Sequence, residues 1–512
     1  MNELLQMKTI TVTEPLSDVA EECTINGDYL LPEYCPDVAV VLKCMITPQI
    51  QTRRPSGDTF AVEGVAVVRV LYLDEERTCV REAEFTQPIH CALRVPDGCE
   101  GIPIRVWVMQ DYVNCRAVSS RRIEVRSGFT MHARAQRVCS LELPCESAVK
   151  RLHTKEQSEA VSRHCAAGEK MLTVNETLAF DSSRPSAEQL LGGECTAAVT
   201  EVKLLTDKAI VKGCLYLHQL YASDVVNGST AVLDFTIPFS AIMDVEGVRS
   251  GQQYTAYVSV LSDTEECVAG EGGMSSSLLF TAKLLVQLHT YEKETVTLIT
   301  DAYHCDCPVS VDRERLLLQA LEDTLCQTVT MQKELALPDE HLREILDVWL
   351  MPLTPQGEVQ SGHAQFRVPM VVSMLARNVD GAVVYYEQVE DFTTECALSL
   401  RGDAEVSLQA TASVIGINYA ALGDKLDLRV TVSLSCEWWR KTQADVVREL
   451  TLQEECAFAD DGATMRLYYA QSGESVWDIA RHCHTSPNAV REENNLHDDV
   501  LSVKTVLLIP TD

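Results

Sequence analysis

The most constraining feature of this sequence is a pattern that occurs three times, at intervals of 149 and 155 residues. In each copy, three apolar residues spaced i, i+3, i+4 precede a segment rich in Val, Ile, Leu and Tyr, and a Phe-Thr dipeptide follows. The triplets are Val38/Val41/Leu42, Ala187/Leu190/Leu191 and Leu342/Ile345/Leu346, and the apolar segments are 60–72, 209–221 and 365–376. A period of this length is too long for one turn of a solenoid, so the pattern predicts tandem copies of a whole domain.

The pattern within each copy predicts mostly strands. Partial alternation in the apolar segments, and again at 121–126 and 425–429, is typical of antiparallel strands. Each triplet predicts a short helix after a proline, and the stretches 146–171 and 311–335 predict longer connecting helices. In the third copy, Val368-Pro369 replaces a glycine and predicts a β-bulge or an edge strand. The expected fold class is therefore multidomain, β-dominated α+β, with three tandem β-rich domains and connecting helices.

The C-terminal residues follow a different pattern. A strand over 466–470, a helix from Val476 with apolar residues on one face, a short helix after Ser486-Pro487 and a strand over 506–510 predict the order β-α-α-β. We assign domain bounds of 1–148, 149–305 and 306–457 to the three copies, 458–464 to a linker and 465–512 to the last domain.

Composition excludes several classes of function. The chain has 43 Lys and Arg against 75 Asp and Glu, a net charge of −32, which excludes nucleic acid as a partner because phosphate neutralisation needs basic residues. No apolar run approaches the ~20 residues that span a bilayer. Residues 1–8 show no secretory signal, and the 20 cysteines have irregular spacing. We therefore expect reduced thiols and a cytoplasmic location.

The C-terminal domain resembles a LysM domain. Residues 473–480, 490–496 and 501–510 resemble the family pattern G-D-T-L-W-x-I-A, I-x-x-x-N-x-L and L-x-x-G-x-x-L-x-I-P, although Glu and Lys replace the usual Asp and Gly at 474 and 504. LysM domains generally bind N-acetylglucosamine glycans in a groove between the loop after the first strand and the loop before the last. For a glycan or a protein partner, the resemblance implies groove residues Gly473, Glu474, Ser475, Val476, Asn495, Leu496, Leu501 and Lys504. The residues expected to hold the fold together are Trp477, Ile479, Asn494 and Ile509.

The three upstream copies resemble the SPOCS domain, a β-rich module of proteins from endospore-forming bacteria. The resemblance rests on the start Pro36-Asp37-Val38, on the V-x-G strands at 62–64 and 211–213 and on a Phe-Thr-x-Pro element. Tandem SPOCS units followed by one LysM domain resemble the SipL-like spore coat morphogenetic proteins. That resemblance implies a scaffold in the mother-cell cytoplasm at the forespore surface. Its LysM domain would dock on a SpoIVA-like coat protein, and other coat proteins are further partners.

Motifs of catalysis are not evident in the sequence. It has no phosphate-binding G-x-x-x-x-G-K-[ST] loop, no H-E-x-x-H and no G-x-S-x-G elbow, and the three copies share no acid, base or nucleophile. His304-Cys305-Asp306-Cys307 is the best metal-like cluster, but the sequence offers no fourth ligand at matched spacing. We therefore expect a non-enzymatic protein without a cofactor or a metal.

One stretch reverses the acidic charge of the chain. Between residues 105 and 137, seven arginines stand against two acidic residues. Such a run is typical of a solvated strand face, and the alternative is a docking patch for an acidic partner, a neighbouring copy or anionic lipid. The arginines are Arg105, Arg116, Arg121, Arg122, Arg126, Arg134 and Arg137. The leading hypothesis is a coat-assembly scaffold, and the alternative is a protein that binds peptidoglycan through its LysM domain.

Overall fold

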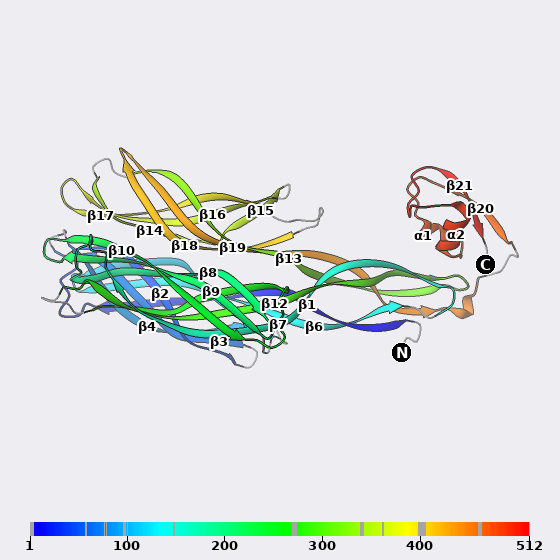
Figure 1. Ribbon diagram of the computed structural model, residues 1–512, viewed down its shortest axis with the longest axis horizontal. Coiled ribbons are helices and arrows are strands. Elements are labelled where there is room, and N and C mark those ends of the chain that lie inside the picture. The colour runs from blue at the N-terminus through cyan, green and yellow to red at the C-terminus, as the bar shows by residue number, and fades with distance from the viewer. Residues whose placement is uncertain are drawn as a thin grey trace.

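The computed structural model describes residues 5–56, 59–75, 77, 79–95, 99, 101–146, 149–268, 274–337, 342–360, 363–397, 406–458 and 463–510. Most of these residues lie in antiparallel β-strands, and the two α-helices of the described residues both lie near the C-terminus. Figure 1 shows a body of sheets, a narrow stalk that extends from it, and a small domain at the far end of the stalk.

The strands form three sheet pairs, each from one continuous stretch of chain. The first pair has the strand orders β1 (Gln6–Leu30), β6 (Arg122–Glu146), β5 (Arg105–Ser119) and β2 (Val40–Ser56), β3 (Thr59–Leu73), β4 (Val80–Arg94). The second has β7 (Leu152–Ala179), β12 (Ser277–His304), β11 (Gln253–Cys267) and β8 (Gln189–Leu205), β9 (Lys208–Asp224), β10 (Ser229–Asp244). The third has β13 (Val309–Ala336), β19 (Lys425–Leu452), β18 (Val406–Leu422) and β14 (Leu342–Pro352), β16 (His363–Asn378), β17 (Val383–Ala397), with β15 (Gln356–Gln360) also pairing with β16.

Each sheet pair buries an apolar core between its two sheets. Phe60 and Met131 lie in the first core, Phe280 in the second, and Phe366 and Trp438 in the third. Each of these cores takes its residues from one sheet pair only, as expected when a repeated sequence unit encloses its own hydrophobic centre. The predicted domain bounds themselves stay a prediction.

The three apolar triplets begin or precede strands, which corrects the predicted short helices. Pairing between neighbouring strands shifts by one residue at the end of every triplet, at Leu42, Leu191 and Leu346. The extra residue follows position i+3 of each triplet, where side chains would otherwise alternate between the two faces of the sheet. The adjacent apolar residues at i+3 and i+4 therefore mark a β-bulge repeated in all three copies.

The predicted connecting helices are also wrong, because residues 152–171 lie in β7 and residues 311–335 lie in β13. Residues 147 and 148 fall outside the described residues. Leu318, Ala320 and Leu321 are all buried, and Gln319 between them is buried too. A strand covered on both faces shows no alternation, and its long pairing with β19 overrides the helix propensity of Leu, Glu and Lys. The predicted strands at 121–126 and 425–429 are confirmed as the starts of β6 and β19.

The glycines of the repeat lie where two strands approach closely. A Cβ atom on Gly64 would lie 2.0 Å from the carbonyl oxygen of Gln49, and one on Gly213 would lie 2.2 Å from that of Ala198. In the third pair the neighbouring strand is interrupted here, because β14 ends at Pro352 and β15 starts at Gln356. Val368 and Pro369 lie opposite the gap between β14 and β15. The predicted bulge or edge strand is therefore wrong, because β16 is a central strand whose neighbour on one side is interrupted.

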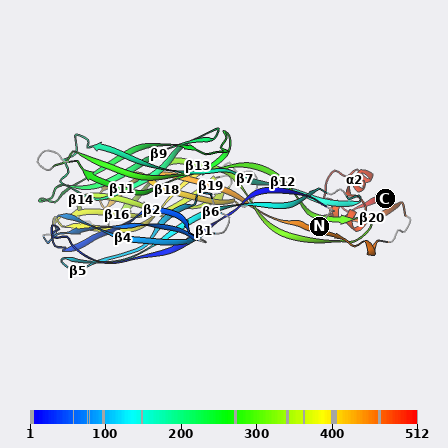
Figure 2. The ribbon, with the colours of Figure 1, turned by 90° about the horizontal axis from the view of Figure 1, so that it is seen from below.

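The stalk is built from strand ends that extend beyond the body. Past Arg134, Tyr291 and Arg440, the strands β6, β12 and β19 lose their pairing with β5, β11 and β18 and pair only with β1, β7 and β13. The stalk therefore comprises residues 6–17 with 135–146, 152–163 with 292–304, and 309–319 with 441–452. Figure 2 shows these arms running together toward the C-terminal domain.

A shared core holds the stalk together. It contains Ile10, Leu143, Leu298, Leu318 and Val446, which come from all three sheet pairs. A two-stranded arm cannot cover both of its own faces, so each arm packs against the other two. The stalk is thus the part of the molecule in which the three sheet pairs depend on one another.

The C-terminal domain has the predicted order, with β20 (Met465–Ala470), α1 (Val476–His482), α2 (Pro487–Asn494) and β21 (Thr505–Pro510). The helix α1 begins where the Ser475 hydroxyl accepts the backbone N–H of Asp478, and α2 begins with a proline in its first turn. Val490, Leu507 and others form its core. A short 3₁₀ turn (Glu454–Cys456) precedes it, and residues 459–462 of the predicted linker lie outside the described residues.

Candidate functional site

Two loops of the C-terminal domain run side by side and bring together five of the eight predicted groove residues. The backbone N–H of Gly473 donates to the carbonyl of Leu501 over 2.7 Å, and the N–H of Leu501 donates to the backbone carbonyl of Glu474 over 2.9 Å. The N–H of Val476 donates to the backbone carbonyl of Asp499 over 2.8 Å. Gly473 has a φ of +93°, a left-handed conformation that favours glycine. Residues 473–476 and 499–501 therefore form one continuous surface.

The groove residues differ in what they offer to a ligand. Val476 and Leu501 are buried, so their side chains belong to the core. Gly473, Asn495 and Lys504 are exposed, and Leu496 is half-buried against the core. No hydrogen bond in the described part of the chain joins Asn495 or Lys504 to the two loops. A ligand at these loops would therefore meet mainly backbone groups.

The Glu474 and Ser475 side chains already have partners. The Glu474 carboxylate accepts the backbone N–H of Gln471 over 2.9 Å. The Ser475 hydroxyl caps α1 and donates to the Asp478 carboxylate over 2.5 Å. Both side chains therefore shape the first loop, and neither is a free donor that faces a ligand.

Asn494 ties α2 to the last strand. Its amide nitrogen donates to the carbonyls of Val490 and Leu508, over 2.9 and 2.6 Å, and its amide oxygen accepts the N–H of Leu508 over 2.7 Å. Ile479 and Ile509 are buried in the same domain core. These three side chains are structural in the described fold.

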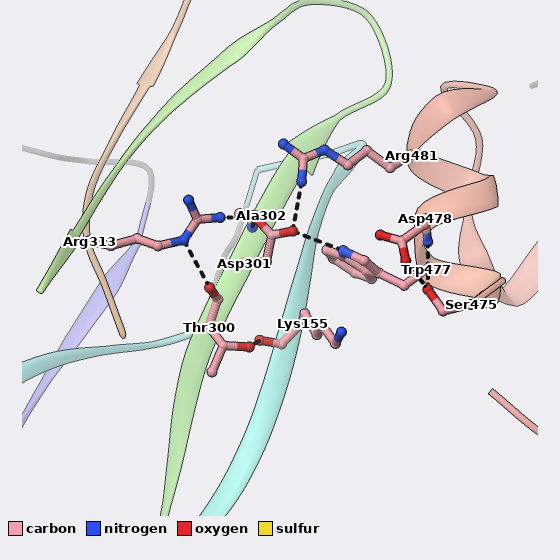
Figure 3. A network of polar contacts seen from close by, with 9 residues as sticks. All are labelled: Lys155, Thr300, Asp301, Ala302, Arg313, Ser475, Trp477, Asp478 and Arg481. Carbon is pink, nitrogen blue, oxygen red and sulfur yellow. Dashed lines mark hydrogen bonds and ion pairs between the residues drawn. The ribbon is translucent and has the colours of Figure 1, made fainter. Parts of the chain in front are cut away.

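Trp477 also joins the C-terminal domain to the stalk (Figure 3). Its indole N–H donates to the Asp301 carboxylate over 3.0 Å, and the Arg481 guanidinium donates to the same oxygen over 2.8 Å. The other oxygen accepts from Arg313 over 2.5 Å. Asp301 follows a β-bulge in β12, and bulges re-aim side chains. One half-buried carboxylate thus links two strands of the stalk to helix α1.

Aromatic packing extends this contact. The Tyr303 ring lies edge-on to Trp477 with centroids 4.9 Å apart, and its hydroxyl donates to the carbonyl of Thr485 over 2.7 Å. Burial raises the pKa of the Tyr303 hydroxyl, which therefore stays a donor. Phe458 stacks on His484 at 3.7 Å, and burial lowers the pKa of that histidine. No local sequence pattern at Asp301 or Tyr303 signals this contact, because its partners stand about 180 positions further along the chain.

The sequence analysis also missed an exposed apolar surface on the two-stranded sheet of this domain. Leu467 pairs with Leu508 and Tyr469 with Val506 across the sheet, so their side chains share one face. Tyr469 is 67% exposed and Leu467 is 63% exposed. We call this surface the outer sheet face; its residues are Met465, Leu467, Tyr469, Val506 and Leu508. The alternation along each strand was the signal that could have revealed it.

Most arginines of the 105–137 stretch have acidic partners within the first sheet pair. Arg116 and Arg126 share Glu124, over 2.5 and 2.7 Å. Arg121 binds Asp37, and Arg122 binds Asp28. Arg137 lies on β6 in register with Glu14. The side chains of Arg116, Arg121, Arg122 and Arg126 are therefore paired on the surface of their own sheet pair.

Arg105 and Arg134 lie instead where the three sheet pairs meet. The Arg105 guanidinium lies 4.1 Å from the centre of the Tyr257 ring, and burial lowers its pKa. Arg134 binds Asp18 over 2.5 Å and approaches Glu437 of the third pair at 3.8 Å. The structure thus places these two arginines against neighbouring copies of the repeat.

The His304-Cys305-Asp306-Cys307 cluster lies at the end of β12 near the C-terminal domain. The His304 ring accepts the backbone N–H of Asp306 over 3.1 Å, and Cys305 and Cys307 are buried. In the described ranges, no group of three or more His, Cys, Asp or Glu side chains is arranged to hold a metal ion.

Comparison with known families identifies two kinds of domain. Residues 37–118 and 186–263 match the family described as SipL, SPOCS domain, and residues 468–510 match the LysM domain. The first two segments cover β2–β5 and β8–β11, which are equivalent parts of the first two sheet pairs. No curated protein and no solved structure matches the chain. Within the described residues, no helix has the length and apolar character needed to cross a membrane.

The chain therefore combines SPOCS domains with a C-terminal LysM domain. This architecture fits a sporulation protein associated with the coat, whose LysM domain binds a glycan or a protein. The resemblance to SipL-like proteins is thereby confirmed.

Proposed function

We propose that this protein is a non-enzymatic scaffold of spore coat assembly that docks through its LysM domain on a SpoIVA-like coat ATPase. It would act in the mother-cell cytoplasm at the forespore surface. The observation that carries this proposal is the position of the LysM domain at the end of the stalk, with its outer sheet face exposed to solvent.

The composition of the outer sheet face supports a protein partner. Five large apolar side chains on one small sheet form the kind of apolar centre that protein interfaces bury. The contacts with the stalk use Trp477, Arg481 and Thr485, none of which belongs to that face. The outer sheet face therefore remains available while the LysM domain is held on the stalk.

The three sheet pairs support a scaffold role through their shape. Their long paired strands hold the LysM domain at a distance from the body, and a shared core ties the stalk arms together. The three copies share no acid, base or nucleophile, which favours a role in assembly over catalysis.

Binding of peptidoglycan is the second candidate function. The paired loops 473–476 and 499–501 favour it, because their backbone groups line the region where the LysM family binds acetamido groups. Two features of this groove disfavour sugar binding. Lys504 is exposed at the usual position of a glycine, and the side chains of Val476 and Leu501 are buried, so fewer side chains can contact a sugar.

Calorimetry on the full chain separates the two functions. The chain is titrated in parallel with a SpoIVA-like ATPase and with chitin-type oligosaccharides. We expect the ATPase to bind and the sugar not to bind, and a Leu467→Asp variant to lose at least about 10-fold in affinity for the ATPase, since a charge at an apolar interface centre is desolvated without a partner.

The matched control is Val226→Asp, which places the same charge at an exposed apolar site in the body. It should bind the ATPase like the unmodified chain. Sugar binding without ATPase binding would overturn the proposal, and an unchanged affinity of Leu467→Asp would exclude the outer sheet face as the docking site.

A further inference from the structure

Two pairs of cysteines face each other across the core of the first sheet pair. Cys23 on β1 forms a thiol–thiol hydrogen bond with Cys91 on β4, and Cys44 on β2 forms one with Cys115 on β5. All four side chains belong to the first apolar core or pack against it. All four are free thiols. Each pair therefore brings a thiol of one sheet into contact with a thiol of the other.

The two cysteine pairs lie at opposite edges of the first sheet pair. The strands β1 and β5 are the edge strands of one sheet, and β2 and β4 are the edge strands of the other. Across the core, β1 packs against β4 and β2 packs against β5. The two partners are 68 positions apart in one cysteine pair and 71 in the other. A covalent bond within each pair would therefore tie the two sheets together along both open sides.

The two thiols of each pair differ in burial and in acidity. Cys91 and Cys44 are buried, whereas Cys23 and Cys115 are half-buried. The Cys91 thiol donates its hydrogen bond to the Cys23 sulfur and lowers the pKa of Cys23, and Cys44 does the same to Cys115. These hydrogen bonds and burial raise the pKa of Cys91 and Cys44. The more accessible thiol of each pair is thus the one that ionises more readily, which is the arrangement of an attacking and a resolving cysteine.

The repeated fold does not itself require cysteine at these positions. Counted from the triplet and from the Phe-Thr dipeptide, the second copy has Gly193 where the first has Cys44, and Ala241 where the first has Cys91. A single buried cysteine would be explained as a small apolar side chain. Packing alone does not explain two facing pairs that repeat the same difference in burial and acidity.

We infer that the pairs Cys23–Cys91 and Cys44–Cys115 are two sites of reversible disulfide formation, which lock the two sheets of the first pair together when the chain meets hydrogen peroxide. The thiolate of Cys23 or Cys115 attacks one peroxide oxygen, which gives a sulfenic acid and one water after protonation. The partner thiol then attacks the sulfenic sulfur, forms the S–S bond and releases the second water. Two thiols thus lose two electrons and two protons, and the peroxide is reduced to two waters. A thiol reductant reverses the reaction by exchange.

The geometry of the first sheet pair suits these bonds. Sulfur atoms that share a hydrogen bond need to approach by only about 1–2 Å to reach the disulfide length of about 2.05 Å. Sandwiches of the immunoglobulin type carry a disulfide of this kind between their two sheets. A bond that spans about 70 residues restricts the unfolded chain and so stabilises the folded sheet pair. This lock is separate from LysM docking, and failure of either proposal leaves the other intact.

The test maps the thiols of the full chain by mass spectrometry. The reduced protein is treated with hydrogen peroxide under native conditions, the remaining thiols are alkylated, and the digest is searched for linked peptides. We expect both links to form within one chain. Hydrogen exchange of the edge strands β1, β2, β4 and β5 should slow at least about 10-fold, because the links oppose opening of the sheets. Dithiothreitol should reverse both changes.

Serine variants separate the two links. Cys23→Ser should abolish the first link and leave the second, and Cys115→Ser should do the reverse. The control Cys326→Ser removes an exposed thiol of the third sheet pair and should leave both links unchanged.

Four outcomes would overturn the inference. These are no link at a peroxide concentration that oxidises the exposed Cys326, links of these cysteines to other partners, links that form only after unfolding in urea, and links that leave hydrogen exchange unchanged. Should a serine variant fail to fold, the unmodified chain still decides the matter, since the map of links and the exchange rates need no variant.

Discussion

The LysM domain and the three sheet pairs are stabilised in opposite ways. The LysM domain takes most of its core residues from 465–510, with Tyr303 and Cys305 of the stalk packed against them, and most of its hydrogen bonds join neighbouring loops and helices. The sheet pairs depend on strands from distant parts of the sequence, and the stalk depends on all three pairs together. The comparison shows that local sequence patterns are sufficient for a small module, whereas the stalk requires the whole chain to be folded.

The largest test of this comparison is Leu298→Ala in the stalk core. Leu298 is 1% exposed and packs with residues from all three sheet pairs, so we expect its loss to cost about 2–5 kcal/mol of unfolding free energy. Urea unfolding of the full chain, followed by circular dichroism, measures this cost.

The matched variant is Ile479→Ala, a buried residue of the LysM core. It should destabilise only the LysM domain and leave the sheet pairs unchanged. If Leu298→Ala leaves the unfolding of the sheet pairs unaltered, the stalk is not a shared structure.

The link between the two regions is tested by Asp301→Ala. Asp301 accepts hydrogen bonds from Trp477, Arg481 and Arg313, and bonds to a charged group are worth about 1.5–3 kcal/mol each. We expect the LysM domain to loosen from the stalk, with a red shift in the fluorescence of Trp477 as its indole meets water. Asp312→Ala removes an exposed carboxylate of the same stalk and should leave the spectrum unchanged.

Gly213→Ala tests whether the repeated glycine is required by close strand approach. Its new Cβ would lie 2.2 Å from the carbonyl of Ala198, so we expect a loss of about 1–3 kcal/mol in unfolding free energy. Gly416→Ala is the control, since its Cβ would meet its nearest neighbour, Thr431, at an ordinary 3.7 Å. Similar losses in the two variants would show that strand flexibility, and not the contact, explains the glycine.

The contact between the second and third sheet pairs should depend on pH. Burial alone would lower the pKa of His218, but the Asp347 and Asp234 carboxylates raise it to about 10. The folded state then holds a proton that the unfolded state releases near pH 6.5, so this stabilisation is complete below about pH 6.5 and is lost as the pH rises toward 10.

We expect stability to fall by about 1 kcal/mol per pH unit between pH 7 and 9 from this group, and His218→Gln to flatten that slope. Urea midpoints of both proteins across this range measure the effect. A slope that is the same in both proteins would show that other groups set the alkaline stability.

The sequence alone was sufficient where the pattern is local. The predicted order of helices and strands in the LysM domain was confirmed, because the helix starts and the helical period of 3.6 residues depend on neighbouring residues. The main strands of the three copies were also predicted, since alternation persists wherever one face is exposed. For the candidate site, family resemblance predicted the paired loops, but the sequence analysis missed both the outer sheet face and the contact of Trp477 with Asp301.

Only the tertiary structure decided the rest. The bulges at Leu42, Leu191 and Leu346 imitate a helical spacing, and burial on both faces at 318–321 removes the alternation of a strand. The stalk and the position of the LysM domain both arise from contacts between residues more than 100 positions apart. Such contacts leave no periodic signal in the sequence. The alternation of apolar residues along a strand shows which of its faces is buried, but it does not show which partner buries that face.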